Sequence, residues 1–147
     1  MAVRVQEADF DVSAEIDALT AGNTEIGAVT TFTGLVRGAG ISEMVLEHYP
    51  GMTEKALSEL EAEAQKRWPL DGTLIIHRIG PLMPGDRIVL VAAASRHRRA
   101  AFEAAEFLMD YLKTKAPFWK KEMTGTEGRW VDARDTDNSA AERWSKS

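Results

Sequence analysis

The stretch "TLIIHRIGPLMPGDRIVLVAAAS", residues 73–95, indicates how this chain folds. It contains two apolar runs, residues 73–79 and 86–95, whose composition is that of strands. Between the runs stands "GPLMPGD", in which "PGD" at 84–86 is a strong turn signal. We therefore predict a pair of central strands, with the remaining elements arranged around them.

Helices and further strands are predicted on both sides of this pair. Helical spacing of apolar residues and capping signals predict helices at residues 13–19, 53–68, 96–115 and 139–144. Runs of β-branched and aromatic residues predict strands at 26–36 and 43–49, and "FWKKEMT" and "GRWVDA" predict a last hairpin. Because no repeat or linker separates these elements, we predict one α+β domain over residues 1–147.

The longest predicted helix, residues 96–115, has a stripe of small and apolar side chains. The stripe consists of Ala101, Ala105, Leu108 and Leu112, with Phe102 and Met109 beside it. Alanines on such a stripe allow a close approach of the packing partner. We expect this helix to lie tightly against the core.

The composition limits the classes of function. With 147 residues and 44% hydrophobic content, the chain can fill a sizeable core. Its net charge of -5 repels nucleic acid and anionic membranes, so we predict neither as a partner. The absence of cysteine excludes a disulfide or a nucleophilic thiol in this chain. An acidic start and the lack of a long apolar run predict a soluble, cytoplasmic protein.

A basic turn, "SRHRR" at residues 95–99, lies at the start of the long predicted helix. Cations are unfavourable there because the helix dipole already places about half a positive charge at this end. An anion would offset that cost, and a helix start is a natural phosphate or carboxylate site. The alternative is a solvated turn whose arginines pair with Glu103 and Glu106.

A second cationic segment, "KTKAPFWKKE" at residues 113–122, lies where the same helix is predicted to end. The helix dipole accounts for lysines before Pro117, but not for the two that follow it. Arg37 ends the strand predicted at 26–36 and is followed by a Gly-rich loop. Its guanidinium could therefore point into a pocket beneath that loop. Spacing alone indicates that this region handles a phosphorylated or carboxylated ligand.

Common catalytic templates find no support in the sequence. The histidines at 48, 77 and 97 are far apart and have no cysteine beside them, so we predict no metal site. The G-x-S-x-G, P-loop and G-x-G-x-x-G motifs are absent, and we predict no bound cofactor.

Five ordered motifs resemble the large, catalytic subunit of molybdopterin synthase, the MoaE family. They are "GAVTTFTGLVR", "LEHYPGMTEKAL", "HRIGPLMPGDRIVLV", "SRHRRAAFEA" and "MDYLKTKAPFWKKE". The resemblance runs from about residue 26 to Trp144. It implies an α/β-hammerhead fold with an additional small antiparallel β-subdomain.

The resemblance also implies an activity in molybdenum cofactor biosynthesis. Enzymes of this family insert the two dithiolene sulfurs into cyclic pyranopterin monophosphate, precursor Z, to form molybdopterin. The sulfur arrives as a thiocarboxylate on the C-terminal Gly-Gly tail of a ubiquitin-like small subunit of the MoaD type. Two large subunits form a homodimer within a heterotetramer, with one small subunit at each end.

Site residues follow from the same resemblance. The substrate-contacting positions are Leu35, Val36, Arg37, His97, Arg98, Lys113, Lys120, Lys121 and Glu122. Lys113 and Lys120 resemble the family's two essential lysines: Lys113 is expected to assist proton transfer beside the thiocarboxylate, and Lys120 to hold the pterin. Arg37, His97 and Arg98 are expected to bind the phosphate and the pterin edge. Leu35 stands where some members have lysine, and the loop after Arg37 is shorter than in many of them.

Two other functions are consistent with the cationic segments. A non-catalytic module could bind a phosphorylated metabolite or an RNA end through the basic turn, in which case the lysines around Pro117 would be replaceable. A scaffold for a ubiquitin-like partner would bind the partner's tail but no small molecule. Both alternatives predict that no dithiolene product forms.

Overall fold

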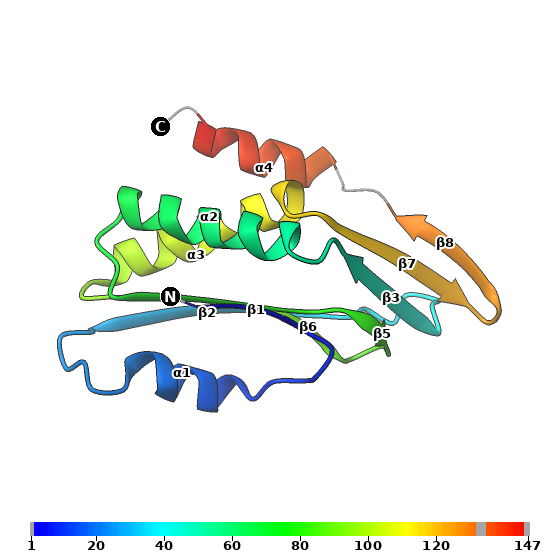
Figure 1. Cartoon of the computed structure of the whole chain (residues 1–147), viewed down its shortest axis with the longest axis horizontal. Coiled ribbons are helices and arrows are strands. Elements are labelled where there is room, and N and C mark those ends of the chain that lie inside the picture. Colours follow the sequence, from blue (N-terminus) through cyan, green and yellow to red (C-terminus); the bar gives the residue numbers. More distant parts are fainter. Residues whose placement is uncertain (1, 132–134, 146–147) are drawn as a thin grey trace.

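Two four-stranded sheets organise the described part of the chain, residues 2–131 and 135–145 of a computed structural model (Figure 1). The first sheet has the order β1-β4-β6-β2, formed by Ala2–Gln6, Gly72–Arg78, Arg87–Ser95 and Ala28–Leu35. β1 runs parallel to β4, and the other neighbours are antiparallel. The predicted central pair is confirmed, because β4 and β6 occupy the two inner positions.

The second sheet is fully antiparallel and has the order β5-β3-β7-β8. Its strands are Gly80–Leu82, Glu43–His48, Phe118–Thr124 and Glu127–Val131. The predicted hairpin is β7 and β8, and the final "DA" of its predicted second half lies outside the described residues. In Figure 1 this sheet extends from one end of the first.

Two short strands were missing from the prediction. β5 lies inside the segment predicted as a turn, because Leu82 is fully buried and pairs with Met44 of β3. Its Pro81 is compatible with a strand at a sheet edge, where no backbone donor is needed. β1 is too short to be recognised locally, and becomes a strand by pairing Val3 with Ile75 and Val5 with His77.

Helices cover both faces of the first sheet. They are α1, α2, α3 and α4, at Val12–Thr20, Met52–Arg67, Arg98–Lys115 and Asp135–Ser145. α2 and α3 lie on one face and α1 on the other, while α4 packs on α3 (Figure 1). All four predicted helices are confirmed within two residues at most ends, α4 starting four residues earlier than predicted.

The main core lies between the first sheet and the α2–α3 layer. Ile75 and Val91 of the sheet meet Phe107 and Leu108 of α3, and all four side chains are fully buried. The whole predicted alanine and leucine stripe of α3 is buried. Phe102, expected beside the stripe, is instead 60% exposed.

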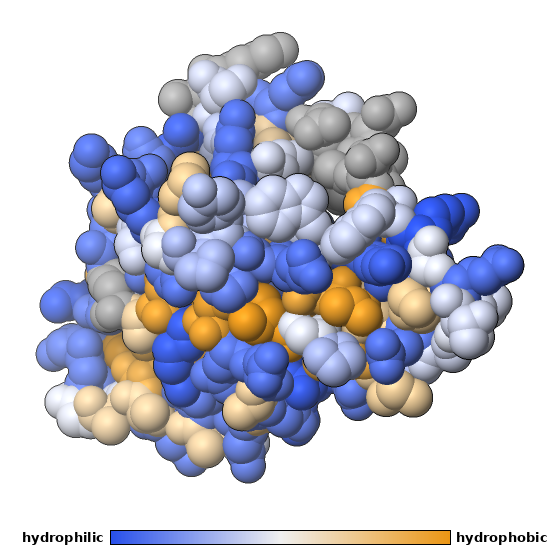
Figure 2. Space-filling view, turned by 45° about the vertical axis from the view of Figure 1, so that its right-hand side comes forward, coloured by the Kyte–Doolittle hydropathy of each residue, from blue (hydrophilic) through white to orange (hydrophobic). Residues whose placement is uncertain are grey.

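Apolar side chains also reach the surface. Seen from the side of the second sheet, they form a band across the molecule with polar surface above and below it (Figure 2). Large exposed apolar residues of the described chain are Phe32, Leu35, Tyr49, Met52, Met83, Phe102, Trp119 and Trp130. Exposed apolar surface of this kind marks candidate contacts with other chains.

Glu61 is a buried carboxyl on α2 whose ionisation opposes folding. It accepts a 2.6 Å hydrogen bond from Thr73 Oγ1, and burial nevertheless raises its pKa above the ordinary value of 4.5. A raised pKa in the folded state means that the stability Glu61 contributes is complete below pH 4.5 and declines as the pH rises through the folded pKa. Neutral pH is therefore the less favourable condition for this side chain.

Replacing Glu61 by glutamine is expected to stabilise the protein more at pH 7 than at pH 4.5, because the amide can bond to Thr73 without carrying a charge. The measurement is the free energy of unfolding in denaturant at both pH values. Glu59→Gln, an exposed change on the same helix, is the control and should shift both values equally. A larger gain for Glu61→Gln at pH 4.5 than at pH 7 would contradict the expectation.

Candidate functional site

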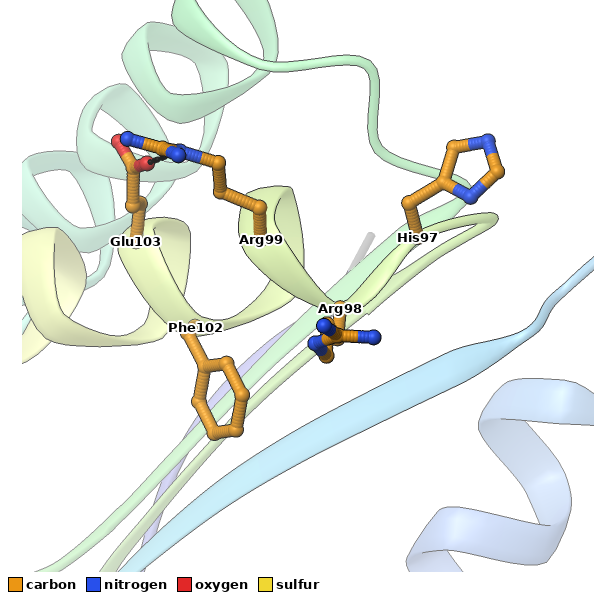
Figure 3. Close-up of a pocket in the computed structure, with 5 residues that line it drawn as sticks. All are labelled: His97, Arg98, Arg99, Phe102 and Glu103. Atoms are coloured by element: carbon orange, nitrogen blue, oxygen red, sulfur yellow. Dashed lines mark hydrogen bonds and ion pairs between the residues drawn. The ribbon is translucent and has the colours of Figure 1, made fainter.

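The start of α3 lines a cavity of about 540 Å³. Its walls are His97, Arg98, Arg99, Phe102 and Glu103. Figure 3 shows that Arg98 and Phe102 project from one side of the helix, whereas Arg99 and Glu103 meet on another. Two residues predicted from the sequence, His97 and Arg98, therefore share one cavity.

The arginines of this turn have different surroundings. Arg99 donates to Glu103 at 2.8 Å, and this bond lowers the pKa of the Glu103 carboxyl. The predicted alternative, an arginine paired with Glu103, thus holds for Arg99. Arg98 is exposed and takes part in no ion pair among the described residues.

The helix start itself favours an anion. The N-cap residue His97 makes no capping hydrogen bond with its side chain, and the first turn of α3 contains no acid. The free backbone N–H groups and the positive end of the helix dipole are therefore left uncompensated locally. Together with the Arg98 guanidinium, they suit a phosphate or carboxylate group.

A second group of predicted residues lies at the end of β2. Val36 is 2% exposed, its N–H donates to the Asp86 carbonyl and its own carbonyl accepts from Gly85. These two bonds fix the backbone of Val36, which connects Leu35 to Arg37. Leu35 and Arg37 on either side of it are exposed.

The end of α3 brings Lys113 to the same end of the first sheet. Lys113 is exposed in the last turn of the helix, and the chain then turns through Pro117 into β7. Thr53 braces this turn: its buried Oγ1 donates to the Pro117 carbonyl and accepts from the Tyr49 N–H, both at 3.0 Å. The position of Lys113 relative to β7 is therefore fixed by a hydrogen bond from α2.

The register of β7 separates its two lysines. Lys120 pairs with Leu46, a buried residue of β3, and Glu122 lies on the same face because side chains alternate along a strand. Lys121 points to the opposite face, where its Nζ lies 5.6 Å from the centre of the Trp130 ring. A ligand on the Lys120 face therefore meets Glu122, but not the side chain of Lys121.

Glu122 also lines a second cavity, of about 330 Å³. This cavity lies between the Gly-rich loop at 39–41 and the hairpin of β7 and β8. Glu122 pairs there with Arg129 at 3.6 Å. The short loop after Arg37 thus forms one wall of the space in which Glu122 lies.

The predicted residues fall into two groups at opposite ends of the first sheet. β2 pairs Ala28 with Ser95, just before α3, and Leu35 with Arg87, at the far end of β6. β2 spans about 23 Å from Ala28 to Leu35, because its eight residues are separated by steps of roughly 3.3 Å. α3 is continuous, so Arg98 and Lys113 are about 22 Å apart along its axis.

One side chain of the second group was not predicted. His77 of β4 is 6% exposed, and its ring stacks on Phe118 with 3.7 Å between the ring centres. Burial lowers the pKa of this ring, and the charge of Lys113 contributes in the same direction. The available signal was a single histidine inside the otherwise apolar run at 73–79.

The described residues contain no group of three histidine or acidic side chains arranged to hold a metal ion. Among the same residues, no helix combines the length and the apolar character required to cross a bilayer.

Comparison with known proteins places this arrangement in a family. The family of the MoaE protein matches residues 5–115. The molybdopterin synthase catalytic subunit of Ralstonia nicotianae is 62% identical over 146 residues, which cover 97% of this chain and 83% of that protein.

Solved structures agree with this comparison. Molybdopterin cofactor biosynthesis protein E from Burkholderia multivorans has a TM-score of 0.86 and 56% identity, and the match covers 98% of this chain and 96% of that one. The complex of subunits 1 and 2 of the molybdopterin-converting factor from Helicobacter pylori shares the fold at 20% identity. Its TM-score is 0.75, with 90% and 91% of the two chains covered.

Proposed function

The chain belongs to the MoaE protein family, so its activity is that of a molybdopterin synthase catalytic subunit, and we propose how its residues divide the work. The donor is a thiocarboxylate on the Gly-Gly tail of a MoaD-type small subunit, and the acceptor is precursor Z. The observation that carries the proposal is the separation of the predicted cations into two groups, one around Arg98 and one around Lys113.

The Lys113 group is proposed to carry the sulfur transfer. Lys113 stands at the exposed end of α3 and assists proton transfer beside the thiocarboxylate, while Lys120 holds the pterin and its developing charge. Arg37 and Leu35 contact the substrate from the end of β2, and Glu122 from β7. Lys121 contributes less than Lys120, because its side chain lies on the other face of β7.

The Arg98 group is proposed to bind the phosphate of precursor Z. The start of α3 provides the positive end of a helix dipole, and Arg98 adds a guanidinium that no acid of the described chain neutralises. His97 lines the same cavity. These groups bind an anion without needing a metal ion.

A homodimer is needed to bring the two groups to one substrate. A pterin monophosphate is too short to bridge about 22 Å along α3. The edge strand β2 carries Phe32, which is 43% exposed, and α3 carries the 60% exposed Phe102. An uncovered sheet edge with large apolar side chains suits a second copy of the chain, whose Arg98 would then face the first copy's Lys113.

Two finer features belong to the same proposal. The α+β arrangement of two sheets is proposed to be the α/β-hammerhead fold with its antiparallel subdomain, which would correspond to the second sheet. A cytoplasmic location is proposed because the family acts in the biosynthesis of a small-molecule cofactor.

The direct test is incubation of the protein with a thiocarboxylated small subunit and precursor Z, followed by detection of the dithiolene product. A small subunit that lacks its last two glycines is expected to bind more weakly and to support no turnover, because its tail no longer reaches Lys113. The full-length small subunit without the thiocarboxylate is the matched control: it should bind normally but yield no product. Turnover with the truncated subunit would overturn the insertion of the tail.

A further inference from the structure

His77 occupies a position where an apolar residue would be expected. It lies on β4, where five of the other six residues are buried, and side chains two apart on a strand face the same way. His77 therefore faces the same side as Ile75, toward the core below α2 and α3. A polar ring in such a place costs free energy unless its nitrogens are used.

One ring nitrogen has a structural use. His77 Nδ1 lies 2.8 Å from the carbonyl oxygen of Arg78. Because a carbonyl oxygen only accepts hydrogen bonds, Nδ1 carries the hydrogen, and the neutral ring has its lone pair on Nε2. Burial lowers the pKa of His77 to about 4, and the nearby Lys113 and His48 act in the same direction. The ring is thus neutral at physiological pH, with Nε2 as an acceptor.

The orientation of the ring is also fixed. Phe118 covers one face of the imidazole, with an interplanar angle of 18°. Phe118 is itself held by the register of β7, in which it pairs with His48 of β3. The bond to Arg78 and the stack on Phe118 together leave the ring little freedom to turn. Nε2 is therefore a directed acceptor.

Lys113 follows Leu112, whose buried side chain belongs to the core cluster against which Phe118 packs, and the charge of Lys113 contributes to the lowered pKa of His77. Lys113 lies five residues before Phe118, and the intervening Pro117 is anchored by Thr53. We propose that His77 is a positioning residue for sulfur transfer, whose imidazole Nε2 accepts a hydrogen bond from the Lys113 ammonium and holds it toward the incoming tail. This inference rests on the proposed function, because it assigns Lys113 its orientation in that reaction.

Three substitutions of His77 test the contributions of Nδ1, of Nε2 and of the ring shape separately. His77→Asn can keep the bond to the Arg78 carbonyl but has nothing in place of Nε2. His77→Gln places a carbonyl oxygen near the position of Nε2. His77→Phe keeps the stacked ring beside Phe118 without any polar atom.

His77→Asn and His77→Phe are expected to lower kcat for dithiolene formation about 10-fold to 100-fold, with KM for precursor Z and binding of the small subunit almost unchanged. His77→Gln is expected to keep most of the wild-type kcat. A purely structural role would not give this split between kcat and KM, nor rescue by glutamine. Thermal unfolding of each variant shows whether it is folded.

The outcomes distinguish this inference from the function on which it rests. A wild-type protein that forms no dithiolene product would overturn the proposed function itself. With an active wild type, a His77→Asn variant that keeps kcat within about threefold overturns the positioning role. The role is also overturned if a folded His77→Gln is as impaired as His77→Asn. If His77→Phe does not fold, the asparagine and glutamine variants decide alone.

Discussion

Replacing Lys113 by alanine is expected to reduce the rate of dithiolene formation about 100-fold or more, the loss typical of a missing acid or base. The side chain is exposed at the last turn of α3, so its removal should leave the fold intact. Loss of one cation from a helix C-terminus costs only a few tenths of a kcal/mol. The measurement is single-turnover product formation with saturating thiocarboxylated small subunit.

Lys115→Ala is the matched control for this prediction. Lys115 is also an exposed lysine in the last turn of α3, so both changes remove the same charge from the same helix end. Lys115→Ala should keep near-normal activity, and both variants should bind the small subunit. Near-normal product formation by Lys113→Ala would contradict the catalytic assignment and favour a module that only binds its partner or a phosphorylated metabolite.

Mixing two inactive variants is expected to restore activity. Arg98→Ala and Lys113→Ala should each be inactive as homodimers, because each site then lacks either its phosphate contact or its catalytic lysine. If a site combines Arg98 of one subunit with Lys113 of the other, a mixed dimer has one site with both defects and one with none. Each mixed dimer should therefore regain about half of the wild-type activity.

The mixture is prepared by co-refolding the two variants with different affinity tags, so that the mixed dimer can be isolated and assayed. A dimer of two Lys113→Ala subunits carrying both tags is the control, and should stay inactive. Proven mixed dimers that are as inactive as their parents would contradict the shared site. In that case Arg98 and Lys113 do not serve one substrate, since the unbroken α3 keeps them apart within a subunit.

Much of this protein could be predicted from local pattern. Turn residues at 84–86 and apolar runs on both sides identified β4 and β6, and helical spacing identified α2 and α3. The two cationic segments, residues 95–99 and 113–122, could also be recognised from the sequence, because charge at a helix end is a local property. An unbroken helix from the basic turn to Lys113 also implied that Arg98 and Lys113 lie far apart.

Other features depend on which distant segments pair, and local pattern does not contain that information. β1 exists because its backbone bonds to β4, about 70 residues later in the chain, a separation visible in the pairing of Val3 with Ile75. Lys120 and Lys121 are on opposite faces because side chains alternate along a strand, but the register of β3 with β7 decides which face each one takes, and a shift by one residue would exchange them. The same register sets Phe118 on His77. The sequence by itself thus determined the elements and the positions of the cations along them, whereas the tertiary structure decided which side chains face Lys113. The physical reason is that strand register and side-chain stacking arise from contacts between residues far apart in the chain.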